Sequence, residues 1–228
     1  MSQKKTGSLT EEAYHTLRSD ILACRLRPDE KLIISDLCTR LGVSLGAVRE
    51  ALSRLTSEGL VTSEPHKGFK VAPVTMAELE DITKVRTKIE SLCLESAIAN
   101  ADLKWETAIV STTHELSRIP LQDPNDPARV SEIWTEAHKR YHEALVANCD
   151  SDWMLKIREI LFAQSERYRQ FSVPLDRTTR DIAAEHRAIA DAAIDRDASL
   201  ACELLRQHLT RTTRILLDAN LAAPQGAK

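Results

Sequence analysis

Hydrophobic side chains recur every three or four residues along most of the chain, which is the spacing of helices that bury one face. The first such segment carries Ala13, Leu17 and Ile21 at intervals of four. Ser8 lies three residues before Glu11, which is the spacing of a capping box. The pattern therefore predicts a first helix over about residues 10–23.

Two shorter helical segments follow. Ser35 begins the first of them, which stops near Gly42. Ser44 is placed to cap the second, which ends at Gly59. Because only a tight turn separates the two segments, the pattern predicts a helix-turn-helix.

After Gly59 the hydrophobic period changes from helical to alternating. The stretch LVTSEPHKGFKVAP alternates around a turn that contains Pro65 and Gly68, which predicts a β-hairpin. A hairpin directly behind a helix-turn-helix is a wing. We place the end of this N-terminal domain at Pro73 to Thr75, so that it spans residues 1–75.

Everything beyond residue 75 follows a helical pattern, with breaks at prolines and at capping residues. The prolines of PLQDPNDPA and Pro174 interrupt the pattern, and Asp197 can cap the last helix. Six helices are predicted, at about 76–100, 103–118, 128–149, 152–171, 177–195 and 198–220. The predicted fold is therefore mostly α, with an N-terminal winged helix-turn-helix (1–75), a C-terminal all-α bundle (76–222) and a flexible tail (223–228).

The third predicted helix has the polar first turn that suits insertion into the major groove of double-stranded DNA. Ser44, Leu45 and Arg49 would lie within reach of the DNA. Arg49 can make a bidentate contact to guanine, and Ser44 with the free N–H groups of the helix start can hold a phosphate. The alternative is a packing module in which Arg49 pairs with Glu50 or Glu58 on a solvated face.

Four of the seven histidines lie on apolar faces of the predicted bundle. His138 and His142, four residues apart in HKRYHEAL, border a stripe formed by Val130, Ile133, Trp134, Ala137, Tyr141, Ala144 and Leu145. His186 and His208 lie on apolar stripes of the last two helices. A lone histidine of this kind is more often a hydrogen-bonded core residue than a ligand. Burying four separate imidazoles would be costly, so the set favours shared coordination of one divalent metal ion.

Composition narrows the class of protein. The chain has 228 residues, 43% hydrophobic and 29% charged, which is typical of a globular protein. Residues 1–75 carry 11 Lys and Arg against 9 Asp and Glu within a chain of net charge −3, so a slightly basic head precedes an acidic body. Five scattered cysteines indicate reduced core residues rather than disulfides. With no apolar run long enough to cross a membrane and no signal peptide, we expect a cytoplasmic protein.

The head resembles the DNA-binding domain of the GntR family of bacterial transcriptional regulators, on the stretch LRSDILACRLRPDEKLIISDLCTRLGVSLGAVREALSRLTSEGLVTSEPHKGFKVAPV. The resemblance implies that Arg49 reads a base, that Lys67 and Gly68 approach the minor groove, and that Arg40 and Arg54 contact phosphates. His66 is a further candidate on the wing. Leu45 stands where the family usually has arginine, and Pro28-Asp29 stands where it usually has a Pro-Gly turn.

The body resembles the effector-binding FCD domain of the FadR branch of that family, on VRTKIE, HKRYHEAL and AEHRAIADAAIDRDASLACELLRQHL. Many members hold zinc or nickel with one aspartate and three histidines. In this sequence His138 occupies the aspartate position, and His142, His186 and His208 match the histidines. The resemblance implies a homodimeric regulator, most simply a repressor, that binds an inverted-repeat operator and is controlled by a small carboxylic acid. The neutral His138 would make a zinc site, or a nickel site, more positive and favour an anionic effector.

Four further residues are candidates for binding the effector. Arg86 corresponds to a family position that often faces the effector, but it could equally form a salt bridge with Glu90. Arg167, Tyr168 and Arg169, in SERYRQF, are the others, although a charged stretch of this kind is more often a solvated helix face.

The competing functional class is a metal-dependent hydrolase. HKRYH has the histidine spacing of HExxH but lacks the glutamate that would act as general base, and no other catalytic motif is present. We therefore expect a regulator rather than an enzyme.

Overall fold

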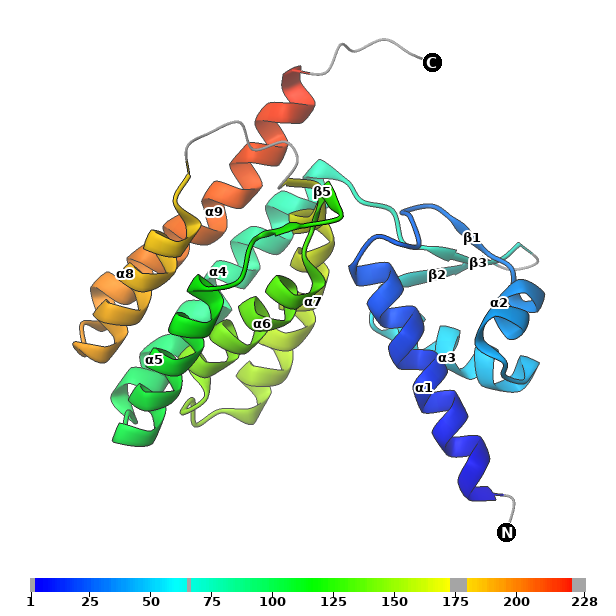
Figure 1. Cartoon of the computed structure of the whole chain (residues 1–228), viewed down its shortest axis with the longest axis horizontal. Helices are drawn as coiled ribbons and strands as arrows, with labels where there is room; N and C mark the ends of the chain where they lie inside the picture. The colour runs from blue at the N-terminus through cyan, green and yellow to red at the C-terminus, as the bar shows by residue number, and fades with distance from the viewer. Residues whose placement is uncertain (1–2, 65–66, 173–179, 223–228) are drawn as a thin grey trace. The chain divides into compact units, whose positions relative to one another are not determined.

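The computed structural model describes residues 3–64, 67–172 and 180–222. The chain divides into two compact units, residues 1–75 and 76–228 (Figure 1). The predicted tail at 223–228 lies outside the described residues. Each unit has its own hydrophobic core.

The N-terminal unit contains three helices and a small antiparallel sheet. The helices are α1 (Gln3–Leu22), α2 (Ile34–Leu41) and α3 (Leu45–Ser57), and the strands are β1 (Lys31–Leu32), β2 (Val61–Glu64) and β3 (Gly68–Val71). The strand order is β1-β3-β2. Leu17, Val48, Ala51, Leu52 and Leu55 are completely buried between α1 and α3, which explains the helical period of these segments.

The ends of these helices agree with the predicted signals only in part. The Ser44 hydroxyl accepts a hydrogen bond of 3.3 Å from the Ala47 amide, as the cap of α3 should. Gly42, at φ 66°, ends α2 in the left-handed region. Two predictions were wrong. Helix α1 begins at Gln3, so Ser8 lies inside it rather than at its start, and α2 begins at Ile34, one residue before Ser35.

The hairpin of β2 and β3 is the predicted wing, with Val61 opposite Val71 and Ser63 opposite Phe69. Strand β1 was not predicted, because two residues are too few to show a period. The turn before it contains Asp29 at φ 63°, a conformation that glycine adopts without strain and aspartate tolerates. The Asp29 carboxylate lies 3.2 Å from Lys70 Nζ on β3.

The C-terminal unit is a bundle of six helices in the described part of the chain, so the mostly α fold class is confirmed. They are α4 (Met76–Ala99), α5 (Leu103–Ser117), α6 (Glu132–Val146), α7 (Asp152–Ser172), α8 (Ile182–Ile194) and α9 (Ala198–Ala222). Figure 1 shows α4 beside both α7 and α9. No helix among the described residues is both long and apolar enough to cross a bilayer.

The stretch before α6 was predicted incorrectly. Helix α6 begins at Glu132 rather than near residue 128, because Ser131 caps it by accepting a hydrogen bond from the Trp134 amide. The preceding residues form a short hairpin of β4 (Gln122–Asp123) and β5 (Asp126–Val130). Helix α8 likewise begins at Ile182, where Asp181 caps it, and most of the predicted stretch before that lies outside the described residues.

Candidate functional site

Four histidines from three helices meet inside the bundle. His138 and His142 come from α6, His186 from α8 and His208 from α9. All four side chains are buried, and one nitrogen from each lies within 4.8 Å of the corresponding nitrogens of the others. His15 and His114 are exposed elsewhere, and His66 lies outside the described residues.

Aromatic side chains of α6 contact the cluster. The Tyr141 hydroxyl donates a hydrogen bond of 2.8 Å to the backbone carbonyl of His186, and the Tyr141 side chain is completely buried. The Trp134 ring stacks on His138 at a centroid distance of 4.5 Å. Ile133, which was predicted to share the apolar stripe, is instead 70% exposed. The buried stripe is therefore narrower than the sequence suggested, and it includes His138 and His142.

The nitrogen positions fit a shared cation. His138 Nε2 lies 3.1 Å from His142 Nε2. Two nitrogens bound at ~2.0–2.1 Å to neighbouring positions of one zinc ion would be about 2.9–3.4 Å apart, with four ligands or with more. Among the described residues, the buried Nε2 of His186 has no hydrogen-bond partner. Buried polar atoms of this kind are uncommon unless a water or ion satisfies them, so the residues present fit a metal ion.

Electrostatics keep these imidazoles neutral. Burial lowers the pKa of His138, His142 and His186 well below the usual histidine value, and the neighbouring imidazoles lower each pKa further. Burial also lowers the pKa of His208, although hydrogen bonding to Glu185 opposes the shift. A neutral imidazole with a free lone pair is the form that binds a metal.

Two ion pairs adjoin the cluster, one partly buried and one buried, and the sequence did not reveal either. The Glu185 carboxylate lies 2.9 Å from His208 Nδ1 and pairs with Arg180 at 2.7 Å. Burial alone would raise the pKa of Glu185, but the hydrogen bonds from His208 and Arg180 outweigh it and lower that pKa. Glu166 pairs with Arg169 at 2.6 Å and lies 3.9 Å from His138 Nδ1.

A cavity of about 70 Å³ opens beside the cluster. Its wall includes His138 and His208, together with the guanidinium groups of Arg86, Arg169 and Arg180. The polar lining also includes the carboxylate residue Glu166 and the hydroxyl residues Thr83, Ser165, Tyr168, Thr212 and Thr213. The candidates Arg86, Tyr168 and Arg169 therefore all reach the cavity, whereas Arg167 is buried but is not among the lining residues.

Arg86 forms the predicted salt bridge and also lies on the wall of the cavity. Its Nε donates to Glu90 Oε1 at 3.1 Å, the predicted salt bridge, and the same side chain lines the cavity. Arg158 on α7 donates to the other oxygen of Glu90 at 2.9 Å. The Phe162 ring packs against both guanidinium groups, at 4.8 Å from Arg86 and 5.2 Å from Arg158. Arg158 escaped sequence analysis because it carries no motif and lies 68 residues from Glu90 in the chain.

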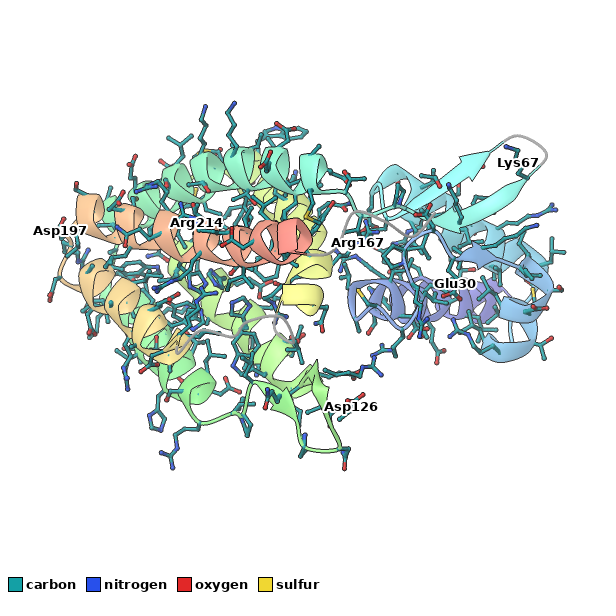
Figure 2. All side chains as sticks on the ribbon, turned by 90° about the horizontal axis from the view of Figure 1, so that it is seen from above. Glu30, Lys67, Asp126, Arg167, Asp197 and Arg214 are labelled. Atoms are coloured by element: carbon teal, nitrogen blue, oxygen red, sulfur yellow. The ribbon has the colours of Figure 1, made fainter. Side chains whose placement is uncertain are left out.

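The expectation that SERYRQF is a solvated face was wrong. Arg167 and Tyr168 are each 1% exposed and Arg169 is 8% exposed. The Tyr168 hydroxyl donates to Glu78 at 2.7 Å, and Arg169 donates to Thr135 at 3.1 Å while lying 4.8 Å from the Trp134 ring. Figure 2 shows Arg167 near the last turns of α7. The charge of Arg169 is tolerated in the bundle because the Glu166 carboxylate pairs with it.

The start of α3 presents the predicted DNA-contacting residues. Ser44, Leu45 and Arg49 are exposed, and Arg49 has no ion pair within the described part of the chain. Glu58, one of the partners considered for it, accepts hydrogen bonds from Tyr14 and Arg18 instead. The side chain of Arg49 is therefore available to a ligand.

Of the other predicted DNA contacts, Arg40 and Arg54 already have ion-pair partners within the protein. Arg40 is exposed but pairs with Asp20 at 2.9 Å. Arg54 pairs with Glu11 at 2.6 Å and stacks on Tyr14, so it would have to leave these partners to reach a phosphate. On the wing, Lys67 is exposed beside the turn and Gly68 adopts φ 85° (Figure 2).

Family models match both units. Residues 9–71 match "Bacterial regulatory proteins, gntR family", and residues 81–211 match "FCD domain". The chain belongs to the GntR family, with a C-terminal FCD domain. Relatives of this GntR-family regulator are transcriptional regulators rather than enzymes.

Two curated relatives resemble the regulator over nearly its whole length. The HTH-type transcriptional regulator BphR of Paraburkholderia xenovorans is 36% identical, over 94% of this chain and 87% of the relative. The HTH-type transcriptional repressor GlaR of Escherichia coli is 35% identical, over 91% of this chain and 96% of the relative. Among solved structures, E. coli McbR/YncC has a TM-score of 0.75 at 20% identity, covering 93% of this chain and 98% of the other. This last similarity shows the fold alone.

Proposed function

We propose that this GntR-family regulator is a repressor whose release from DNA is controlled by a small carboxylate bound at a divalent metal ion in the FCD domain. The observation that carries the proposal is the buried histidine cluster beside an arginine-lined cavity. A ligand releases the operator only if it binds the non-DNA arrangement of the protein more tightly than the DNA-bound one. Repression is supported by the similarity to GlaR.

His138, His142, His186 and His208 would hold the metal. Four imidazoles favour zinc or nickel over magnesium, which prefers oxygen ligands. When bound, the cation supplies a positive centre with open coordination positions for a carboxylate oxygen. Arg86 and Arg169, on the wall of the cavity, would orient the rest of the anion through charge-assisted hydrogen bonds.

Substitution of one ligand tests the metal. His186→Ala should lower the bound zinc or nickel measured by elemental analysis and abolish the effector response, while the winged helix still binds DNA. His114→Ala is the control, because His114 is exposed and lies outside the cluster. Full metal occupancy in His186→Ala would contradict the proposal.

A ligand screen tests the effector class. Small mono- and dicarboxylates should raise the melting temperature of the zinc-loaded protein and release it from operator DNA. The corresponding neutral amides should do neither, because they cannot pair with the cavity arginines. Equal effects of an acid and its amide would exclude charge recognition.

DNA binding is tested at the start of α3. Arg49→Ala should cost about 1–3 kcal/mol of operator binding and relax the preference at one base pair. Arg27→Ala is the control, because Arg27 is also an exposed arginine of the head but lies outside α3. Unchanged operator affinity in the Arg49 variant would refute its role.

We further propose that the regulator is a homodimer, as an inverted-repeat operator requires, and that α4 and α7 form its interface. These two neighbouring helices expose five large apolar side chains: Val85, Leu92, Trp153, Ile157 and Ile160. An exposed apolar strip of this kind marks an interaction surface. Trp153 alone is 73% exposed.

Sedimentation tests the dimer face. Ile157→Asp should convert dimer to monomer and weaken operator binding together, because the two heads would no longer bind as one unit. Leu103→Asp is the matched control, since Leu103 is 77% exposed but lies on α5. A monomeric wild-type chain would refute the homodimer, and an intact dimer in Ile157→Asp would refute this interface.

A further inference from the structure

Glu185 lies in the first turn of α8, and three side chains contact its carboxylate, two of them from α9. His208 Nδ1 lies 2.9 Å from its Oε2. Arg180 forms a two-pronged pair with both oxygens, at 2.9 Å and 2.7 Å, and Arg211 donates to Oε1 at 2.7 Å. The Arg180 side chain is only 5% exposed. The carboxylate is therefore fixed in position, with one oxygen directed at an imidazole of the histidine cluster.

This contact determines which nitrogen of His208 carries the proton. An ionised carboxylate only accepts hydrogen bonds, and Glu185 is paired with the guanidinium groups of Arg180 and Arg211, so Nδ1 must be the donor. Nε2 then keeps its lone pair. Arg180 Nη2 lies 3.3 Å from the same Nδ1, but it has better acceptors in Glu185 and in the backbone carbonyl of His208, at 3.2 Å.

The other imidazoles of the cluster have no comparable support. Glu166 is 3.9 Å from His138 Nδ1, too far for a hydrogen bond. His142 Nδ1 and His186 Nε2 have no partner among the described residues. His208 is thus the histidine of the cluster whose tautomer a carboxylate fixes directly within the described part of the chain.

We propose that Glu185 is a positioning residue for the metal, which holds His208 with Nε2 free to bind, and that Arg180 and Arg211 hold Glu185 in turn. This inference rests on the proposed metal site. A carboxylate behind a histidine ligand fixes its orientation and raises its basicity. Here it also brings negative charge next to four neutral ligands. The alternative is that Glu185 only joins α8 to α9 as an ion pair.

Zinc affinity and the histidine tautomer distinguish these roles. Glu185→Gln keeps the size of the side chain but removes its charge, and it should weaken zinc binding about 10- to 100-fold in competition with a chromogenic chelator. Glu203→Gln is the matched control, because Glu203 is an exposed carboxylate on α9 that pairs with Arg206. Its zinc affinity should match that of the wild type.

The tautomer is read by ¹⁵N NMR of the metal-free wild-type chain, so this measurement does not depend on the folding of any variant. His208 should show a protonated Nδ1. Protonation at Nε2 instead would overturn the inference, as would equal zinc affinity in the wild type and a folded Glu185→Gln. A wild-type chain that binds no zinc would overturn the metal site itself, and with it the role of Glu185 there.

Discussion

Acid should destabilise the metal-free protein steeply. The size of this loss in folding free energy can be worked out from the buried histidine cluster. His138, His142 and His186 are buried, and each has a pKa well below the usual histidine value in the folded state. In the unfolded chain the same residues titrate at about 6.5. Below that pH the unfolded chain takes up protons that the folded chain does not, so stability is present above pH 6.5 and falls as the pH drops.

The loss follows from proton linkage. Each imidazole that stays neutral in the folded state costs about 1.36 kcal/mol per pH unit below its unfolded pKa. Because each imidazole of the unfolded chain is already half protonated at pH 6.5, each group contributes about 1 kcal/mol between pH 6.5 and pH 5.5. Three such groups give about 3 kcal/mol, which is a large share of the 5–15 kcal/mol typical of a domain. Since His208 has a less depressed pKa, its contribution would be smaller.

Urea unfolding in the presence of a chelator, at pH 7.5, 6.5 and 5.5, measures this dependence. The midpoint should change little between the two higher values and fall sharply between the two lower ones. His142→Leu should remove about one third of the slope. His114→Gln should leave the slope unchanged, because His114 is exposed. A flat profile, or stability that rises as the pH falls, would show that the cluster does not stay neutral in the folded state.

Two substitutions test other features of the packing by urea unfolding. Glu90→Gln should lower the free energy of unfolding by about 3–5 kcal/mol, because Arg86 and Arg158 share this one buried carboxylate. A decrease below about 1 kcal/mol would show that the two guanidinium groups do not depend on it. Asp29→Gly should stabilise the protein slightly, because it relieves about 1 kcal/mol of backbone strain at φ 63° and loses only an exposed ion pair with Lys70. A lower free energy of unfolding in this variant would show that the ion pair contributes more than the strain costs.

Long periodic segments and end signals made most of the fold predictable. The winged head and six helices of the body follow from apolar spacing, and Ser44 and Gly42 fix two helix ends. Short elements were missed because they are too brief to show a period, as with β1 and the β4–β5 hairpin. Ser8 misled because a capping-box spacing cannot exclude a helix that simply begins earlier.

The site was predictable only as far as each residue could be judged from its own helix. The histidines stood out because an imidazole on an apolar stripe is unusual. Arg167 and Arg169 were misjudged because a charged stretch looks solvated until the partners that bury it are known. Glu185 directly precedes His186 in sequence but pairs with His208 on the next helix, and only the tertiary structure reveals this.

The charges around the cavity favour an anion even before a metal is considered. Arg169 is matched by Glu166, but Arg86 and Arg158 share Glu90, and the buried Nη2 of each has no hydrogen-bond partner among the described residues. The interior therefore holds more guanidinium than carboxylate. A cation held by four neutral imidazoles would add to this excess, because His138 brings no negative charge. A carboxylate ligand would offset both the excess of guanidinium groups and the charge of the cation. The second of these is larger because His138 stands where the resemblance places an aspartate.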